Sequence, residues 1–198
     1  ASERLLDQAL ARNADAPADE QAWVLTLLAE MATRRGDPAV ADARYQRALS
    51  ISPRDSYLLG AYADFLLDQK RPREAAGLLR GHRRIDALLL RYALAVRQQA
   101  GRNTELAAAM KELDARFSAG LQRGDSVHQR EHARYTLHLR GDARAALVLA
   151  QQNWAVQKEP ADTRLILEAA LASGNRAAAE PVMQWIGKTK LEDVAIAG

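Results

Sequence analysis

A recurring pair of short helices is the pattern that most constrains this chain. Residues 22–55 contain two apolar stripes, each with the 3.6-residue period of an α-helix. The first stripe consists of Leu25, Leu28, Ala29 and Ala32, and the second of Ala41, Tyr45, Ala48 and Leu49. A tight corner at Gly36–Asp37 separates the two helices, and Pro53 closes the unit. The sequence therefore predicts two antiparallel helices that approach closely through small side chains.

The same pattern returns in register further along the chain. The next unit carries equivalent apolar residues on its first helix, namely Leu59, Tyr62, Ala63 and Leu66. A third set follows, with Leu89, Tyr92, Ala93 and Val96. We expect about five helix pairs, over residues 22–55, 56–83, 84–120, 125–160 and 161–188. A half-repeat helix within residues 1–17 is expected before them, and a C-terminal tail after them.

The combination of these features resembles the tetratricopeptide repeat, a helix–turn–helix unit of about 34 residues. The residues that carry the resemblance in the first unit are Ala29, Gly36, Ala41, Tyr45, Ala48 and Pro53. The resemblance implies an all-α fold in which the pairs stack into a right-handed α-solenoid. Residues 18–198 are then expected to form a single domain. Neighbouring repeats would share one continuous core, because no repeat buries its apolar face alone.

Local signals predict where individual helices end. In Arg35-Gly36-Asp37 and Arg140-Gly141-Asp142, the glycine is expected to adopt the left-handed conformation and the aspartate to cap the next helix. Pro181 lies inside the last expected helix, where it would remove a backbone hydrogen bond and kink or divide that helix.

Composition excludes several classes of function. The chain has no cysteine, so disulfides, thiol catalysis and cysteine-ligated metal sites are excluded. No apolar run approaches the roughly 18 residues of a membrane helix. The net charge of +3 is only a weak signal for anionic partners. Abundant Arg and Ala without Cys favour a bacterial protein, and the start at Ala1 rather than Met slightly favours the periplasm or envelope over the cytoplasm.

One short motif suggests an enzyme. His128, Glu131 and His132 match the H-x-x-E-H pattern of inverzincin proteases, in which two histidines on one helix face bind zinc and the glutamate acts as a base. Such a site needs a third protein ligand far downstream, and the candidates considered before Glu192 are Glu168 and Glu180. A solvated helix face is the favoured interpretation, because short motifs often match by chance. We therefore predict no catalytic residue, no metal site and no cofactor, with a zinc-dependent hydrolase as the alternative.

A cluster of arginines suggests another alternative, an adaptor for an anionic partner. The cluster consists of Arg71, Arg73, Arg80, Arg83 and Arg84. A nucleic-acid surface would interleave such residues with aromatic side chains, which this region lacks apart from Tyr92 in the apolar stripe. The pattern favours a solvated face over a nucleic-acid interface.

The favoured function is a non-enzymatic scaffold that binds a peptide or helix of a partner protein. The resemblance implies that the first helices line a concave groove and present a few residues each to the partner. The positions so implied are Trp23, Thr26, Glu30, Tyr57, Asp64, Leu90 and Arg97. Trp23 and Tyr57 are the expected anchors, since aromatic residues with flanking charges suit interfaces. Packing of Trp23 on the N-terminal helix is an equally good interpretation of that residue.

Overall fold

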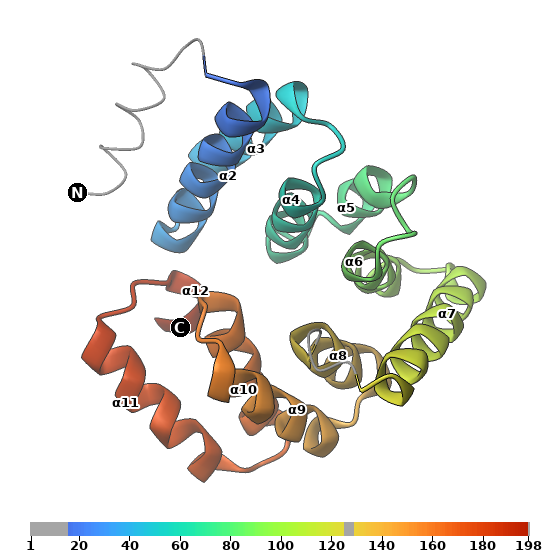
Figure 1. The fold of residues 1–198 in the computed structure, drawn as a ribbon, viewed down its shortest axis with the longest axis vertical. Coiled ribbons are helices and arrows are strands. Elements are labelled where there is room, and N and C mark those ends of the chain that lie inside the picture. The colour runs from blue at the N-terminus through green and yellow to red at the C-terminus, as the bar shows by residue number, and fades with distance from the viewer. Residues whose placement is uncertain (1–15, 125–128, 198) are drawn as a thin grey trace. The chain divides into compact units, whose positions relative to one another are not determined.

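The chain is helical throughout the part that the structure describes. The computed structural model describes residues 16–124 and 129–197, and these ranges contain helices and turns without a strand (Figure 1). The all-α class predicted from the sequence is therefore confirmed for these residues. The chain divides into two compact units, residues 1–101 and residues 102–198. The expected half-repeat helix lies almost wholly outside the described residues.

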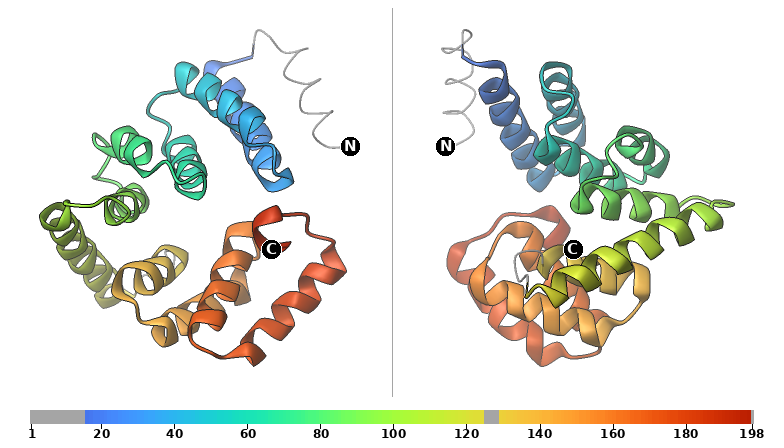
Figure 2. Two further views of the ribbon diagram at one scale, coloured as in Figure 1. Left: turned by 180° about the vertical axis from the view of Figure 1, so that it is seen from behind. Right: turned by 45° about the vertical axis from the view of Figure 1, so that its right-hand side comes forward.

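Unit 1 contains successive helix pairs with neighbouring helices in contact. Its described helices are α2 (Ala18–Arg35), α3 (Pro38–Ile51), α4 (Ser56–Asp68), α5 (Pro72–Leu79) and α6 (Asp86–Arg97). Helix α2 packs on α3 and α4 packs on α5, while α4 also contacts α2 and α6 (Figure 2). The predicted stripe of α2, from Leu25 to Ala32, is buried, as are Ala41, Tyr45 and Ala48 of α3. The helix pairs of this unit are thus held together by the stripes that the sequence shows.

The corners within these pairs share one backbone arrangement. Gly36 has a φ of 79°, and the next amide, that of Asp37, donates to the carbonyl of Ala32 at 2.9 Å. Lys70 occupies the matching corner of the next pair with a φ of 59°, and the amide of Arg71 donates to Leu66 at 2.8 Å.

Asp142 caps α9 (Ala143–Val156) as predicted, by accepting from the amide of Ala145. Asp37 does not cap α3; its carboxylate pairs with Arg35 instead.

Unit 2 has less regular helices. It begins with α7 (Asn103–Gln122), and α8 (Gln129–Tyr135) continues directly into a π-helix, η1 (Thr136–Arg140). The remaining elements are α9 (Ala143–Val156), α10 (Pro160–Ala172), the 3₁₀-helix η2 (Arg176–Ala179), α11 (Glu180–Thr189) and α12 (Val194–Ala197). Helices α8, α9 and α10 pack on one another around a core that includes Ala146, Ile166 and Val182. Pro181 lies in the first turn of α11, so the last expected helix is divided as predicted.

A recurring polar contact joins successive pairs in both units. In unit 1, Asp42 of α3 accepts from the hydroxyl of Tyr62 on α4 at 2.7 Å and from Arg71 at 2.8 Å. In unit 2, Asp114 of α7 accepts from the hydroxyl of Tyr135 on α8, and Arg140 lies 3.2 Å away. The carboxylate therefore belongs to the second helix of one pair, whereas the tyrosine and arginine come from the first helix of the next pair and its corner.

Candidate interaction surface

Two exposed aromatic residues occupy one repeat position on the adjacent first helices of unit 1. Trp23 of α2 and Tyr57 of α4 lie 34 residues apart, and their side chains are 54% and 51% exposed, respectively. The third unit follows the second by only 30 residues, as the buried Ala63 and Ala93 show, so Arg91 of α6 lies one turn beyond the position that matches Tyr57, and it is largely buried. Since packed helices lie about 8–10 Å apart, the two aromatic positions have that approximate spacing. Two large aromatic side chains are thus presented on adjacent first helices.

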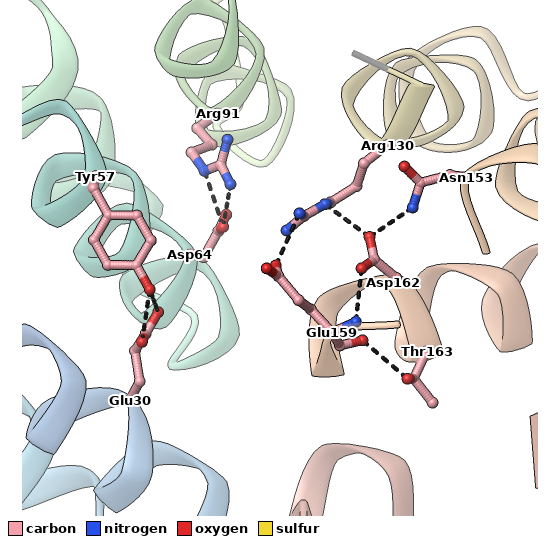
Figure 3. Close-up of polar contacts among 9 residues, drawn as sticks. All are labelled: Glu30, Tyr57, Asp64, Arg91, Arg130, Asn153, Glu159, Asp162 and Thr163. Atoms are coloured by element: carbon pink, nitrogen blue, oxygen red, sulfur yellow. Dashed lines mark hydrogen bonds and ion pairs between the residues drawn. The ribbon is translucent and has the colours of Figure 1, made fainter. Parts of the chain in front are cut away.

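Two acidic residues, Glu30 of α2 and Asp64 of α4, are each bonded to a side chain of the next first helix. The hydroxyl oxygen of Tyr57 lies 2.9 Å from each carboxylate oxygen of Glu30, so its single proton is shared between them. The guanidinium of Arg91 contacts one oxygen of Asp64, from Nε at 2.9 Å and from Nη2 at 2.8 Å (Figure 3). Glu30 and Asp64 occupy one repeat position, 34 residues apart. Each is therefore bonded to the next first helix, but Arg91 lies one turn beyond the position that matches Tyr57.

The change of donor alters the electrostatics of the two contacts. Arg91 is a cation, so its contact neutralises the charge of Asp64. Tyr57 is a neutral donor, and its hydrogen bonds hold the Glu30 carboxylate in place without cancelling its charge. The surface around Glu30 and Tyr57 consequently combines a fixed carboxylate with an exposed aromatic ring.

The other residues implied by the resemblance lie in different environments. Thr26 is 1% exposed, and its hydroxyl donates to the carbonyl of Ala22 at 2.7 Å. Leu90 is fully buried in α6. Neither side chain is available to a partner at the surface, which corrects the expectation for these two positions. Arg97 is exposed at the end of α6.

Sequence reasoning missed three residues that complete this surface. Arg91 lies one turn beyond the position that matches Tyr57, because the third unit follows the second after only 30 residues, so the repeat period does not identify it. Glu20 and Leu27 lie one turn before and one turn after Trp23 on α2 and therefore share its face. Glu20 is exposed and Leu27 is half-buried. Their helical spacing from Trp23 is visible in the sequence, but the rotation of α2 about its own axis is not.

Unit 2 has a different polar network on its first helices. Arg130 of α8 lies 2.8 Å from Asp162 and 2.9 Å from Glu159 at the start of α10. Asp162 is 2% exposed and accepts from the side chain of Asn153 and the backbone amide of Glu159 (Figure 3). Burial raises the pKa of Asp162, and the amide of Glu159 and the charge of Arg130 oppose this shift. These contacts hold the start of α10 against α8 and α9.

A second charged cluster in unit 2 involves the π-helix. His138 of η1 lies 3.0 Å from one oxygen of Glu168, and Arg164 donates to the other at 2.8 Å. Burial alone would raise the pKa of Glu168, but the hydrogen bonds from His138 and Arg164 outweigh it and hold the pKa at about 2. Glu168 is therefore ionised at neutral pH and joins η1 to α10.

Two of the three residues of the candidate zinc motif lie in the part of the chain that the structure describes. His128 lies outside the described residues, while Glu131 and His132 are half-buried on α8. The ring of His132 stacks on Phe117, with centroids 4.8 Å apart and planes at 11°. Burial lowers the pKa of His132. Within residues 16–124 and 129–197, no three metal-ligating side chains are grouped as a metal site would need.

An open groove of about 510 Å³ lies between α3 and the end of α4 in unit 1. It is lined by residues of α3 and by the end of α4, including Gln46, Phe65 and Gln69. Its charged members, Asp42 and Arg71, are bonded to each other. The groove thus belongs to the recurring contact between helix pairs.

Comparisons with family models, with curated proteins and with solved structures gave no match. Among the helices that the structure describes, none combines the length and the apolar character needed to cross a bilayer.

Proposed function

We propose that this chain is a non-enzymatic scaffold that holds a peptide or helix of a partner protein on the first helices of its repeats. In this proposal the helix pairs are tetratricopeptide-like repeats stacked in a right-handed superhelix, whose concave side is formed by α2, α4 and α6. The partner is bound by shape and by a few polar contacts, with little rearrangement of the scaffold.

The observation that supports this proposal is the exposure of Trp23 and Tyr57 at one repeat position on adjacent first helices. Large aromatic side chains provide much of the contact energy at protein interfaces. The Tyr57 ring is held in place by its hydrogen bonds to Glu30, so little side-chain entropy would be lost on binding. A fixed aromatic anchor is better explained by recognition than by packing within the repeat.

The arginine cluster gives less support for an anionic partner. Arg71 is bonded to Asp42 and Glu74, and Arg83 lies over the ring of Tyr92 at 5.1 Å and donates to the carbonyl of Arg80. These side chains are engaged within unit 1, and each contact would compete with a ligand phosphate or carboxylate.

Photocrosslinking from the proposed surface tests the function. A photoreactive phenylalanine analogue is placed at position 57 in the full chain and irradiated in an extract of the source cells. We expect one prominent crosslinked partner, which disappears when Trp23→Ala is added. The same analogue at Val156, which is 83% exposed in unit 2, is the matched control. Crosslinks that are the same from both positions, or that persist with Trp23→Ala, would contradict the proposal.

A further inference from the structure

Helix α11 is attached to the rest of unit 2 by apolar contacts. Val182 is the residue of α11 that is fully buried, and it belongs to the core that α9 and α10 largely form. Ile186 packs against the same core and is half-buried. Trp185 meets Trp154 of α9 edge to face, with ring centroids 5.1 Å apart. Because these three residues of α11 lie at i, i+3 and i+4, one narrow face of the helix provides the attachment.

Polar contacts join α8, α9 and α10 to one another but do not hold α11. Asp162 of α10 pairs with Arg130 of α8 and accepts from the side chain of Asn153 on α9. Within the part of the chain that the structure describes, no ion pair or hydrogen bond joins a side chain of α11 to another element, and the hydroxyl of Thr189 donates to carbonyls of its own helix. The far side of α11 is open to solvent, since Met183 is 55% exposed.

Such an attachment should open more easily than those of α8, α9 and α10. An isolated helix of ten residues is unstable in water, so α11 depends on the few apolar side chains that it buries. Opening α11 breaks no ion pair, whereas opening α10 would break the contacts of the buried Asp162 with Arg130 and Asn153. Elements with few buried contacts open locally while the rest of a domain stays folded.

From this contrast we infer that α11 is a displaceable helix, and that the surface of α9 and α10 beneath it binds an amphipathic helix of a partner protein. The seated α11 defines the chemistry of that helix, namely apolar residues at the spacing of Val182, Trp185 and Ile186, with no charge on that face. The site lies in unit 2, so it is independent of the surface proposed on α2 and α4.

The tether of α11 determines which helices can replace it. Its own chain holds α11 beside the site at an effective concentration in the millimolar range, so an identical helix from a second copy competes poorly at lower concentrations. A helix of another protein succeeds by adding contacts that α11 lacks, such as an ion pair or a hydrogen bond.

Hydrogen exchange of the full wild-type chain, followed by mass spectrometry, tests whether α11 opens alone. We expect the amides of α11 to exchange at least about 100-fold faster than those of α10, which is the internal control in the same unit. Exchange of the two helices at one rate would show that α11 does not open separately and would overturn the inference.

Binding in trans tests the surface beneath α11. The full chain with Val182→Asp and Ile186→Asp carries an α11 that cannot seat, and a labelled peptide of residues 173–191 is the probe. Because the tethered helix no longer competes, the peptide should bind this variant at least about tenfold more tightly than it binds the wild-type chain, with a Kd below about 1 mM. Fluorescence anisotropy measures both affinities.

Matched peptides separate seating at this surface from non-specific binding. Gln184→Ala changes an exposed residue of the probe and should leave the affinity unchanged, whereas Val182→Asp in the probe should abolish binding. Equal affinities of these two peptides, or a probe that does not bind the variant below about 1 mM, would contradict the proposed site.

Two further results would also count against the inference. If α8, α9 and α10 lose their protection from exchange in the variant, α11 is an inseparable part of unit 2. If the wild-type chain self-associates in sedimentation and the variant does not, the occupant is a second copy rather than another protein.

Discussion

The carboxylates of Glu30 and Asp64, at one repeat position, are each held by a different donor from the next first helix. Arg91 is 13% exposed and forms an ion pair with Asp64, whereas Tyr57 is exposed and hydrogen-bonds Glu30. Removing one partner of a largely desolvated ion pair leaves an uncompensated charge, while removing an exposed hydroxyl leaves a carboxylate that water can solvate. The two contacts should therefore differ in their contribution to stability.

We expect Arg91→Met to lower the free energy of unfolding by about 2 kcal/mol, and Tyr57→Phe by less than about 1 kcal/mol. Urea denaturation followed by circular dichroism measures both. The double variant Asp64→Asn/Arg91→Met should recover part of the loss, because no charge is left unpaired. Equal losses for the two single variants would contradict this account.

Glu168 should make the chain sensitive to acid. Its pKa of about 2 in the folded state is below the value of an unfolded glutamate, so its stabilising contribution is complete above about pH 4.5 and is lost as the pH falls towards 2. The side chain is 34% exposed, and solvent screening reduces the effect to about 1 kcal/mol.

The urea midpoint of the wild-type chain should therefore fall between pH 5 and about pH 2.5. In Glu168→Gln the same decrease should be smaller, since the titrating group is gone. Glu180→Gln is the matched control, because no ion pair of Glu180 is described. An unchanged pH profile in Glu168→Gln would show that this carboxylate is not a source of acid sensitivity.

At the scale of the element, the corner at Lys70 combines a standard backbone with an unsuitable residue. It has the left-handed φ and the hydrogen bonds of the Gly36 corner, but a side chain in that conformation costs about 1 kcal/mol. Lys70→Gly should therefore raise the free energy of unfolding by roughly 0.5–1 kcal/mol. Gly36→Ala introduces the same strain at the first corner and should lower the free energy of unfolding by a similar amount. The melting temperatures of the two variants should therefore shift in opposite directions from that of the wild type.

The stripes and most corners could be predicted because they depend on local rules. The buried residues of α2 follow its 3.6-residue period, and Pro181 begins α11 because proline tolerates the first turn. Thr26 was expected at the surface because the resemblance implies that its position lines the groove, yet it is buried and its hydroxyl donates to the carbonyl of Ala22 within its own helix. Leu90 belongs to a helix that is buried around most of its circumference, from Leu88 to Val96. Periodicity cannot identify an exposed side of such a helix.

Contacts between side chains on different helices were harder to predict than the helices themselves. Nothing local to Arg130 indicates that it meets Asp162, because the contact depends on how α8 and α10 pack. The π-helix also has no simple sequence signal, and it determines which face His138 occupies.

At the scale of the whole molecule, the two compact units raise a testable question, namely whether the chain unfolds as one cooperative block or one unit at a time. In repeat proteins, stability is approximately a sum over units and their nearest neighbours. Ala29 is fully buried between helices of unit 1, so Ala29→Arg forces a charge into a close helix contact and should unfold that unit.

The tryptophans allow the units to be observed separately. Trp23 lies in unit 1, whereas Trp154 and Trp185 stack edge to face in unit 2, with centroids 5.1 Å apart. In a Trp23→Phe background, Ala29→Arg should remove a large part of the helical circular dichroism and leave the tryptophan fluorescence and its urea midpoint unchanged. Loss of both signals together would show that the chain unfolds as one cooperative block.

The π-helix at Thr136–Arg140 decides which side of the chain faces α7 where the fourth pair turns its corner. A π-turn holds one residue more than an α-helical turn. Because each residue of an α-helix advances about 100° around the axis, the residues after the π-turn are rotated by about that amount relative to an uninterrupted α-helix of the same sequence. Arg140 faces Asp114, and Gly141 turns the chain into α9, at the orientation that this extra residue supplies.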